Sequence, residues 1–295
     1  MATYIITDSG TDLPPEIVEE YKLKIVPLKL YLDDVEYTDG LDITPKEVFD
    51  KMRTGAMTRT AQVTTQEFVK AFEEYAKEGL SLIYIAFSGV LSGTVNAAYV
   101  AKNDLLERYP DFDITIIDTK CASLGHGMVV LRALEMLKNG APKEEIIEAV
   151  KFHAQHMQHI FTVDDLEYLY RGGRVTRTSA FIGRLLSIKP VLHVDGEGKL
   201  SPIAKVKGRQ SSLRKIAEIA CERGVNLDKQ IIAISHGDDM EAVEVVKGFL
   251  KEMAGCEKFL VSYVGAMIGA HSGPGTLAVF FLDCESPYEK YFGGQ

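Results

Sequence analysis

One stretch of this 295-residue chain indicates its fold class: Ser81-Leu-Ile-Tyr-Ile-Ala-Phe-Ser88-Gly89-Val-Leu-Ser92-Gly93-Thr94. Its first part, Leu82–Phe87, is a short apolar run that predicts a buried strand. The residues after it, Val95–Tyr109, have the pattern of a helix. A strand that leads through a tight turn into a helix is the repeating unit of α/β proteins.

The turn between this strand and helix has the composition of an anion-binding site. Its two glycines let the backbone come close to a ligand, and the N–H groups of Gly93 and Thr94 lack acceptors within the helix. The positive end of the helix dipole points at the same place, beside the hydroxyls of Ser88, Ser92 and Thr94. The alternative is a plain strand-to-helix turn with a Ser or Thr cap.

The first half of the chain is predicted to alternate strands and helices outward from this turn, which favours a mainly parallel sheet covered on both faces. The predicted strands are Tyr4–Thr7, Ile25–Leu32, Leu82–Phe87 and Ile114–Ile117. The predicted helices are Pro15–Tyr21, one beginning at Thr44-Pro45, Thr65–Gly79, Val95–Tyr109, Ser123–Asn139 and Lys143–Gln158.

The second half has a different texture, with a predicted hairpin around Asp195–Gly198 and a mixture of strands and helices. We therefore predict two α/β domains, 1–158 and 159–295, with a mainly parallel sheet in the first and a mixed sheet in the second. The predicted strands are Ile160–Val163, Val191–Asp195, Ile203–Val206, Gln230–Ser235, Lys258–Tyr263 and Thr276–Leu282. The predicted helices are a short one before Arg171, one that reaches Leu186, Gln210–Arg223 and Met240–Glu252.

Composition indicates an ordinary globular protein, with 46% hydrophobic and 25% charged residues. The start lacks a basic leader and no apolar run approaches the roughly 18 residues of a membrane helix, so we expect a cytoplasmic protein without stable membrane insertion. The four cysteines are scattered, so we expect them reduced. His153, His156 and His159 recur every third residue without a neighbouring carboxylate, and we expect no metal site.

Charge is unevenly distributed along this chain, whose net charge is −9. Residues 171–215, which we call the basic segment, contain eleven Lys and Arg but only two acidic residues, a net charge of +9. Such a segment attracts an anionic partner or a phosphate, although solvated surface lysines are the simpler alternative. We expect no nucleic acid partner, because aromatic residues are sparse in it and no nucleic-acid-binding motif is present.

Several polar clusters lie where predicted strands end, the usual place for ligands in open α/β sheets. They are Asp8-Ser9, Thr60-Ala61-Gln62, Ser88–Thr94 and the glycine-rich segment Ile268–Thr276. We expect the last to be a loop of unusual shape that holds His271 beside free backbone amides. Gly-x-Gly-x-x-Gly, a phosphate-binding lysine loop and Gly-x-Ser-x-Gly are all absent, which disfavours nucleotide binding and ordinary hydrolase catalysis.

Taken in order, motifs over nearly the whole chain resemble those of the DegV family. They are Asp8-Ser9 with Asp12-Leu13-Pro14, Leu91-Ser92-Gly93-Thr94, Ile117-Asp118-Thr119 before Ala122-Ser123, Leu169-Tyr170-Arg171-Gly172-Gly173-Arg174, Ile188-Lys189-Pro190-Val191, Lys207-Gly208-Arg209 and His271-Ser272-Gly273-Pro274-Gly275. The resemblance implies a two-domain α/β protein that binds a long-chain fatty acid between its domains. Some members are the acyl-carrying subunit of bacterial fatty acid kinase, which presents the carboxylate to a separate ATP-binding subunit and so yields acyl phosphate for phospholipid synthesis.

The resemblance also implies roles for particular residues. Thr60, Ser92 and His271 match the residues that hold the carboxylate, and Arg174 and Arg209 match arginines suited to docking the kinase subunit. Around them we expect a supporting pocket formed by Asp8, Ser9, Gln62, Ser88, Gly93 and Thr94. This chain has Ala61 and Val63 where the family has Ser and Pro, which leaves Thr60 and Gln62 in place but puts the backbone shape of that loop in doubt.

We therefore expect a fatty-acid-binding subunit that is not catalytic alone and needs no cofactor. Its ligand would have roughly 16 to 18 carbons, and each buried methylene stabilises the complex by about 0.8 kcal/mol. One alternative is a stand-alone hydrolase with Ser92 as nucleophile, His271 as base and Asp8 as the residue that orients it. Another is a lipid carrier without a kinase partner.

Overall fold

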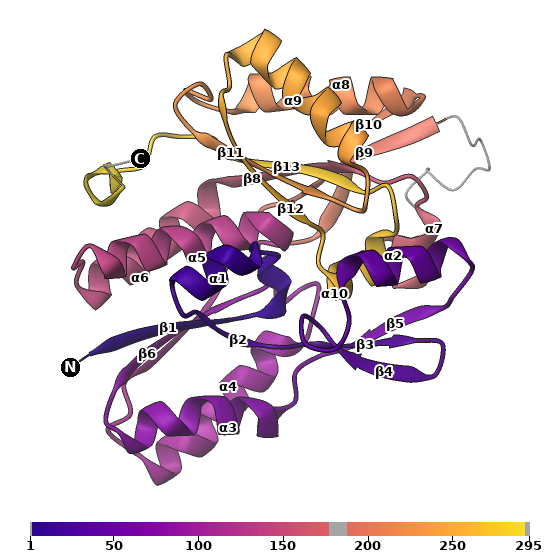
Figure 1. Ribbon diagram of the computed structural model, residues 1–295. Coiled ribbons are helices and arrows are strands. Elements are labelled where there is room, and N and C mark those ends of the chain that lie inside the picture. The colour runs from indigo at the N-terminus through magenta and orange to yellow at the C-terminus, as the bar shows by residue number, and fades with distance from the viewer. Residues whose placement is uncertain (1, 177–187, 293–295) are drawn as a thin grey trace.

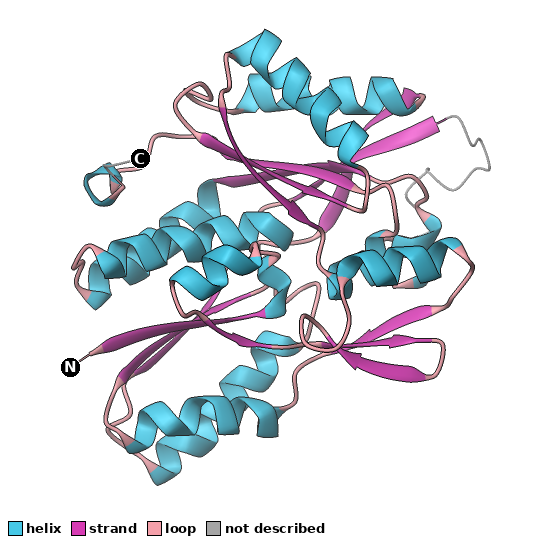
Figure 2. Ribbon diagram, viewed as in Figure 1, coloured by secondary structure: helices cyan, strands magenta, loops and turns pink. Residues whose placement is uncertain are grey.

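The computed structural model describes residues 2–176 and 188–292, which form stacked layers of helices and sheets (Figures 1 and 2). The two large sheets have six and four strands. Figure 1 shows α8 and α9 outside the first of them, α1, α5 and α6 between the two, and α3 and α4 on the far side of the second. The bounds of these helices are α1 Pro15–Glu20, α3 Thr65–Lys77, α4 Thr94–Arg108, α5 Ser123–Lys138, α6 Lys143–His156, α8 Arg209–Arg223 and α9 Met240–Ala254. The layers confirm an α/β fold.

The four-stranded sheet is entirely parallel, as predicted for the first half. Its order is β2 (Lys24–Val26), β1 (Thr3–Asp8), β6 (Ser81–Ala86) and β7 (Ile114–Asp118). All six residues of β6 are buried, because helices cover both faces of the sheet.

The six-stranded sheet is mixed, which confirms the prediction for the second half. Only β11 and β12 pair in parallel, and the other neighbours are antiparallel. Its order is β10 (Leu200–Lys207), β9 (Ile188–Val194), β8 (Met157–Thr162), β13 (Leu277–Leu282), β11 (Ile231–His236) and β12 (Lys258–Tyr263). Strands β9 and β10 form the predicted hairpin, and the proposed domain boundary after residue 158 falls within β8.

A third sheet of three short antiparallel strands was not predicted, and it explains one error. Its order is β4 (Val35–Thr38), β3 (Lys29–Leu32) and β5 (Thr58–Ala61). The prediction of one strand over Ile25–Leu32 was wrong, since β2 ends at Val26 and β3 begins in another sheet. Pro27 lies between them and has no N–H to continue a ladder.

Helix α10 (Ala266–Ser272) packs against this third sheet and against α2 (Pro45–Arg53). The prediction that His271 lies in a loop was therefore wrong, because the turn begins only after α10. A Cβ on Gly269 would lie 2.7 Å from the Phe49 ring, so this glycine allows the two helices to pack closely. The glycine that suggested a loop is a packing residue inside a helix.

The two large sheets share one hydrophobic core across α5. Its buried residues include Ile83 of β6, Val129 of α5 and Phe280 of β13. Because α5 packs on both sheets, it fixes their relative position, and a site between them is rigid.

Two predicted helices differ in extent from the helices that the structure describes. Helix α6 ends at His156 rather than at residue 158, and the helix predicted to reach Leu186 lies partly outside the described residues. The remaining short helices are η1 (Ser9–Thr11), α7 (Glu167–Arg171) and η2 (Glu289–Tyr291). None of the helices in residues 2–176 and 188–292 has the length and apolar character that crossing a bilayer requires.

Candidate functional site

A cavity of about 250 Å³ lies between the two large sheets and the third sheet. Much of its wall is apolar, from Leu28, Phe87, Phe161, Leu169, Val264, Met267 and Phe280. Six predicted residues line it, Gly93 and five with polar side chains that we call the head cluster: Thr60, Gln62, Ser92, Arg174 and His271. An apolar cavity with a few convergent polar groups is typical of a ligand site.

Thr60 and His271 form the first contact of the head cluster. The Oγ1 atom of Thr60, on β5, lies 2.7 Å from Nε2 of His271, at the end of α10. The hydroxyl of Thr58 donates to the carbonyl oxygen of Ala270 at 2.6 Å, which fixes α10 against β5. Burial, and secondly the charge of Arg174, lower the pKa of His271 to about 4, so its ring is neutral at pH 7.

Ser92 is positioned by its neighbour in the turn that leads into α4. Its Oγ atom lies 2.8 Å from Oγ1 of Thr94 and accepts from the Thr94 N–H at 3.3 Å. When the Thr94 hydroxyl donates to Ser92, the Ser92 O–H is left to donate into the cavity. The N-cap residue of α4 is Gly93, so the Ser or Thr N-cap considered for this turn is not formed, and Ser92 instead accepts from the N–H of Thr94, the first residue of the helix.

Gly93 leaves room for the Gln62 side chain beside this turn. A Cβ at this position would lie 2.0 Å from Oε1 of Gln62. The side chain of Gln62 therefore packs directly on the start of α4, and the two polar segments that the sequence analysis treated separately are neighbours.

Arg174 lies in the wall of the cavity, although the sequence placed it only in a docking surface. Its Nε and Nη2 atoms donate to the carbonyl oxygen of Leu91 at 3.2 and 3.0 Å, and Nη1 donates to that of Gly172 at 2.6 Å. Within the described part of the chain its partners are these carbonyls and no carboxylate. Burial lowers the pKa of this guanidinium, and its positive charge favours an anion at the head cluster.

Asp8 and Ser9, which were predicted for the supporting pocket, stabilise the segments that form the cavity wall. Asp8 is buried and accepts from the Tyr84 hydroxyl at 2.7 Å and from the N–H groups of Phe87 and Gly10 at 3.0 Å. Ser9 accepts from the N–H of Leu28. These contacts hold the end of β1 against the neighbouring wall without lining the cavity.

Ser88 and Arg209 lie outside the cavity lining. The Ser88 hydroxyl donates to the carbonyl oxygen of Gly198 at 3.0 Å, which joins the turn after β6 to the β9–β10 hairpin. Arg209 pairs with Asp239 at 2.8 Å and lies 3.7 Å from Asp164. Part of its charge is therefore compensated, whereas no carboxylate in the described part of the chain pairs with Arg174.

The geometry gives no support to the hydrolase alternative. Within the described residues Ser92 is paired with Thr94 and His271 with Thr60, and the carboxylate of Asp8 is occupied elsewhere. A catalytic triad requires these three side chains to be hydrogen-bonded in series. A histidine with a pKa of about 4 would also be a weak general base near neutral pH.

A second polar group in the cavity wall was missed by the sequence analysis. Ser123 donates to Asp12 and lies 3.0 Å from Ser235 through their hydroxyl oxygens. Nearby in the wall, His159 accepts from the Ala122 N–H at 3.2 Å, and its other nitrogen faces the Met157 carbonyl at 2.9 Å. Burial lowers the pKa of His159 to about 4. These residues come from separate elements, and no local motif joins them.

Comparison with known proteins identifies the family. The model of the DegV family of uncharacterised proteins matches residues 2–283. A DegV domain-containing protein of Clostridium perfringens is 44% identical over 286 residues, which are 96% of this chain and 98% of that protein. The chain therefore belongs to the DegV family.

Two solved structures connect the fold to ligands of known type. A DegV family protein of Thermus thermophilus, described for its fatty acid binding, is 32% identical with a TM-score of 0.86, over 95% of this chain and 99% of that one. A stearic acid-binding protein of Eubacterium ventriosum is 25% identical with a TM-score of 0.84, over 95% and 98% of the two chains. This chain is similar to both along nearly their whole length.

Proposed function

We propose that this protein binds one long-chain fatty acid in the cavity, with the carboxylate at the head cluster. The observation that carries the proposal is an apolar cavity in which two hydroxyls, a neutral imidazole and a half-buried guanidinium converge. The fatty acids described for the two similar structures support the same ligand class.

The head cluster provides hydrogen-bond donors for a carboxylate. The Nε2–H of His271 donates to Oγ1 of Thr60, whose own O–H then donates to one carboxylate oxygen. The Ser92 O–H donates to the carboxylate as well, and Arg174 supplies a favourable field. Each hydrogen bond to a charged group contributes roughly 1.5 to 3 kcal/mol, which offsets part of the cost of burying the anion.

The acyl chain provides most of the affinity. A chain of about 16 carbons has roughly 14 methylenes, and burial at about 0.8 kcal/mol each supplies on the order of 11 kcal/mol before ordering costs. Such a ligand is expected to remain bound through purification.

We further propose that the bound carboxylate is presented to a separate ATP-binding subunit, which converts it to an acyl phosphate for phospholipid synthesis. The sequence has no nucleotide-binding loop, so a partner must supply the phosphoryl group. Short hydroxyls and one imidazole leave a carboxylate oxygen more accessible than a bidentate arginine clamp would. The charge of Arg209 and the rest of the basic segment suits an acidic docking surface.

The test has two stages. Native mass spectrometry of the purified protein should show one fatty acid, and delipidated protein should rebind it with a raised melting temperature. An apo mass together with no rebinding would contradict the binding proposal. The loaded protein is then mixed with an ATP-binding fatty acid kinase subunit: acyl phosphate formation supports presentation, whereas binding without turnover favours a lipid carrier.

A further inference from the structure

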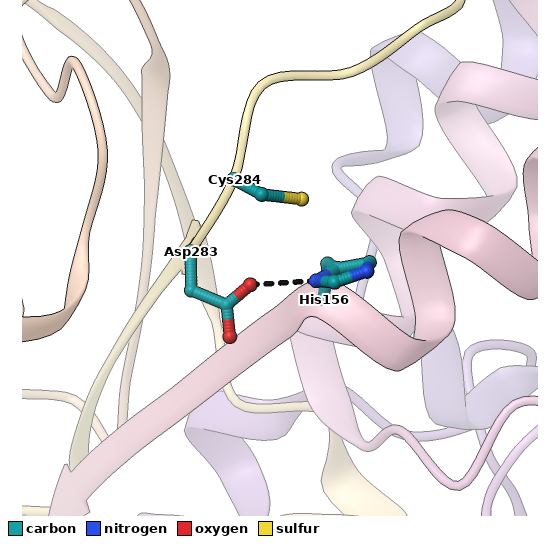
Figure 3. A group of neighbouring side chains, drawn as sticks. All are labelled: His156, Asp283 and Cys284. Atoms are coloured by element: carbon teal, nitrogen blue, oxygen red, sulfur yellow. Dashed lines mark hydrogen bonds and ion pairs between the residues drawn. The ribbon is translucent and has the colours of Figure 1, made fainter.

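His156, Asp283 and Cys284 lie together where α6 and β13 end (Figure 3). In the sequence the three regularly spaced histidines had no carboxylate beside them, so they gave no reason to expect a metal. The fold changes this for His156, because Asp283 and Cys284 reach it from 127 and 128 positions further along the chain. None of the three lines the cavity, so the cluster is separate from the proposed fatty acid site.

The three potential ligand atoms are within reach of a single ion. Nδ1 of His156 lies 2.8 Å from Oδ1 of Asp283, and these atoms and Sγ of Cys284 all lie within 4.8 Å of one another. The N–H of Asp283 donates to the carbonyl oxygen of His156 at 3.2 Å. This backbone hydrogen bond joins the end of α6 to the segment after β13, so the three potential ligands are held close together.

Neighbouring groups orient these ligands in the way that metal sites require. The side-chain amide of Gln158 donates to Oδ2 of Asp283 at 2.7 Å, which leaves Oδ1 turned toward His156. The ring of Phe152 packs on the imidazole with 4.6 Å between ring centroids. His156 is the last residue of the 14-residue helix α6, where the negative end of the helix dipole favours a cation.

We propose that His156, Asp283 and Cys284 form a zinc-binding site. One imidazole nitrogen, one carboxylate oxygen and one thiolate are a donor set that suits Zn²⁺, and a water molecule would complete a tetrahedron. On binding, the thiol proton of Cys284 is released to solvent and the imidazole proton leaves Nδ1, with Nε2 protonated instead. The ion would tie the segment after β13 to the end of α6.

Cobalt tests the site directly, because Co²⁺ in place of zinc absorbs visible light and gives a thiolate-to-metal charge-transfer band. The full-length protein, without a histidine tag and treated with a chelator, is titrated with Co²⁺ and then with Zn²⁺. We expect one ion per chain, a thiolate band, and displacement of cobalt by zinc. Cys284→Ser should lose the band, and His156→Gln should weaken binding strongly.

Two further variants separate a metal site from a nonspecific thiol effect. Cys221→Ser removes another half-buried free thiol, on α8, and should leave the titration unchanged. Gln158→Leu removes the hydrogen bond that orients Asp283 and should weaken zinc binding by about 10- to 100-fold. Circular dichroism and fatty acid binding check that each variant is folded. The absence of stoichiometric binding to the wild type, or a thiolate band that survives in Cys284→Ser, would overturn the proposal.

Discussion

Replacing Ser92 by alanine removes one hydroxyl from the head cluster and leaves the apolar wall of the cavity in place. The Ser92 Oγ atom accepts from the Thr94 N–H, and when the Thr94 hydroxyl also donates to it, the Ser92 O–H is free to donate to the carboxylate. A hydrogen bond to a charged group contributes roughly 1.5 to 3 kcal/mol, which corresponds to an affinity loss of about 10- to 150-fold. The chain contacts should persist, so binding should weaken without being abolished.

A neutral ligand shows whether the lost interaction was with the carboxylate. For the fatty alcohol of the same length, the same hydroxyl makes a neutral hydrogen bond of roughly 0.5 to 1.5 kcal/mol, so the loss should be only about 2- to 13-fold. Dissociation constants for both ligands are measured by calorimetry on delipidated protein. Ser88→Ala is the matched control, since its hydroxyl lies in the same turn but donates to Gly198 instead of lining the cavity.

Either of two results would contradict a hydrogen bond between Ser92 and the carboxylate. The first is a Ser92→Ala protein that binds fatty acid as tightly as the wild type. The second is an equal loss of affinity for acid and alcohol, which would mean that the variant disturbs the cavity rather than a contact with the carboxylate.

Three further predictions concern the groups around the head cluster. Gly172→Ala should weaken fatty acid binding, because the new Cβ would lie 2.2 Å from Nδ1 of His271. The Cβ of Gly173→Ala would meet no atom of residues 2–176 and 188–292 within 4 Å, so this variant should lower only stability, through its φ of +71°. Equal affinities of the two variants in calorimetry would contradict this role of the His271 ring. In urea denaturation, the free energy of unfolding of the wild type relative to His271→Asn should fall as the pH is lowered from 6.5 to 4, by up to about 1.4 kcal/mol per pH unit. The reason is that the unfolded chain binds a proton at His271, whereas the folded protein, in which the pKa of His271 is about 4, excludes it. Parallel pH profiles of the two proteins would contradict this prediction. Arg209→Gln should slow acyl phosphate production when the protein is mixed with the ATP-binding subunit, and should leave fatty acid affinity unchanged because Arg209 does not line the cavity. Turnover at the wild-type rate would contradict a docking role and leave Arg209 with only its contacts to Asp164 and Asp239.

Elements with a strong local pattern could be predicted from sequence. The apolar run of β6, the turn into α4 and the β9–β10 hairpin lie where the sequence placed them. The third sheet was missed because its strands have only four residues each, too few for an alternating pattern to stand out. The sequence predicts a loop at α10 because the segment contains three glycines and a proline, but the first of these glycines, Gly269, lies inside the helix, where the Phe49 ring requires it.

The alternating strands and helices, the polar turn at Ser92 and the polar clusters around Thr60 and His271 could be recognised from the sequence. These properties depend on the chemistry of neighbouring residues. Which residues contact one another depends on the fold: Thr60 contacts His271 across 211 positions, and Arg174 contacts Leu91 across 83. Such contacts depend on how helices pack on sheets, and a single glycine that allows close packing can determine them. The periodicity of a sequence indicates only which face of a helix or strand is buried.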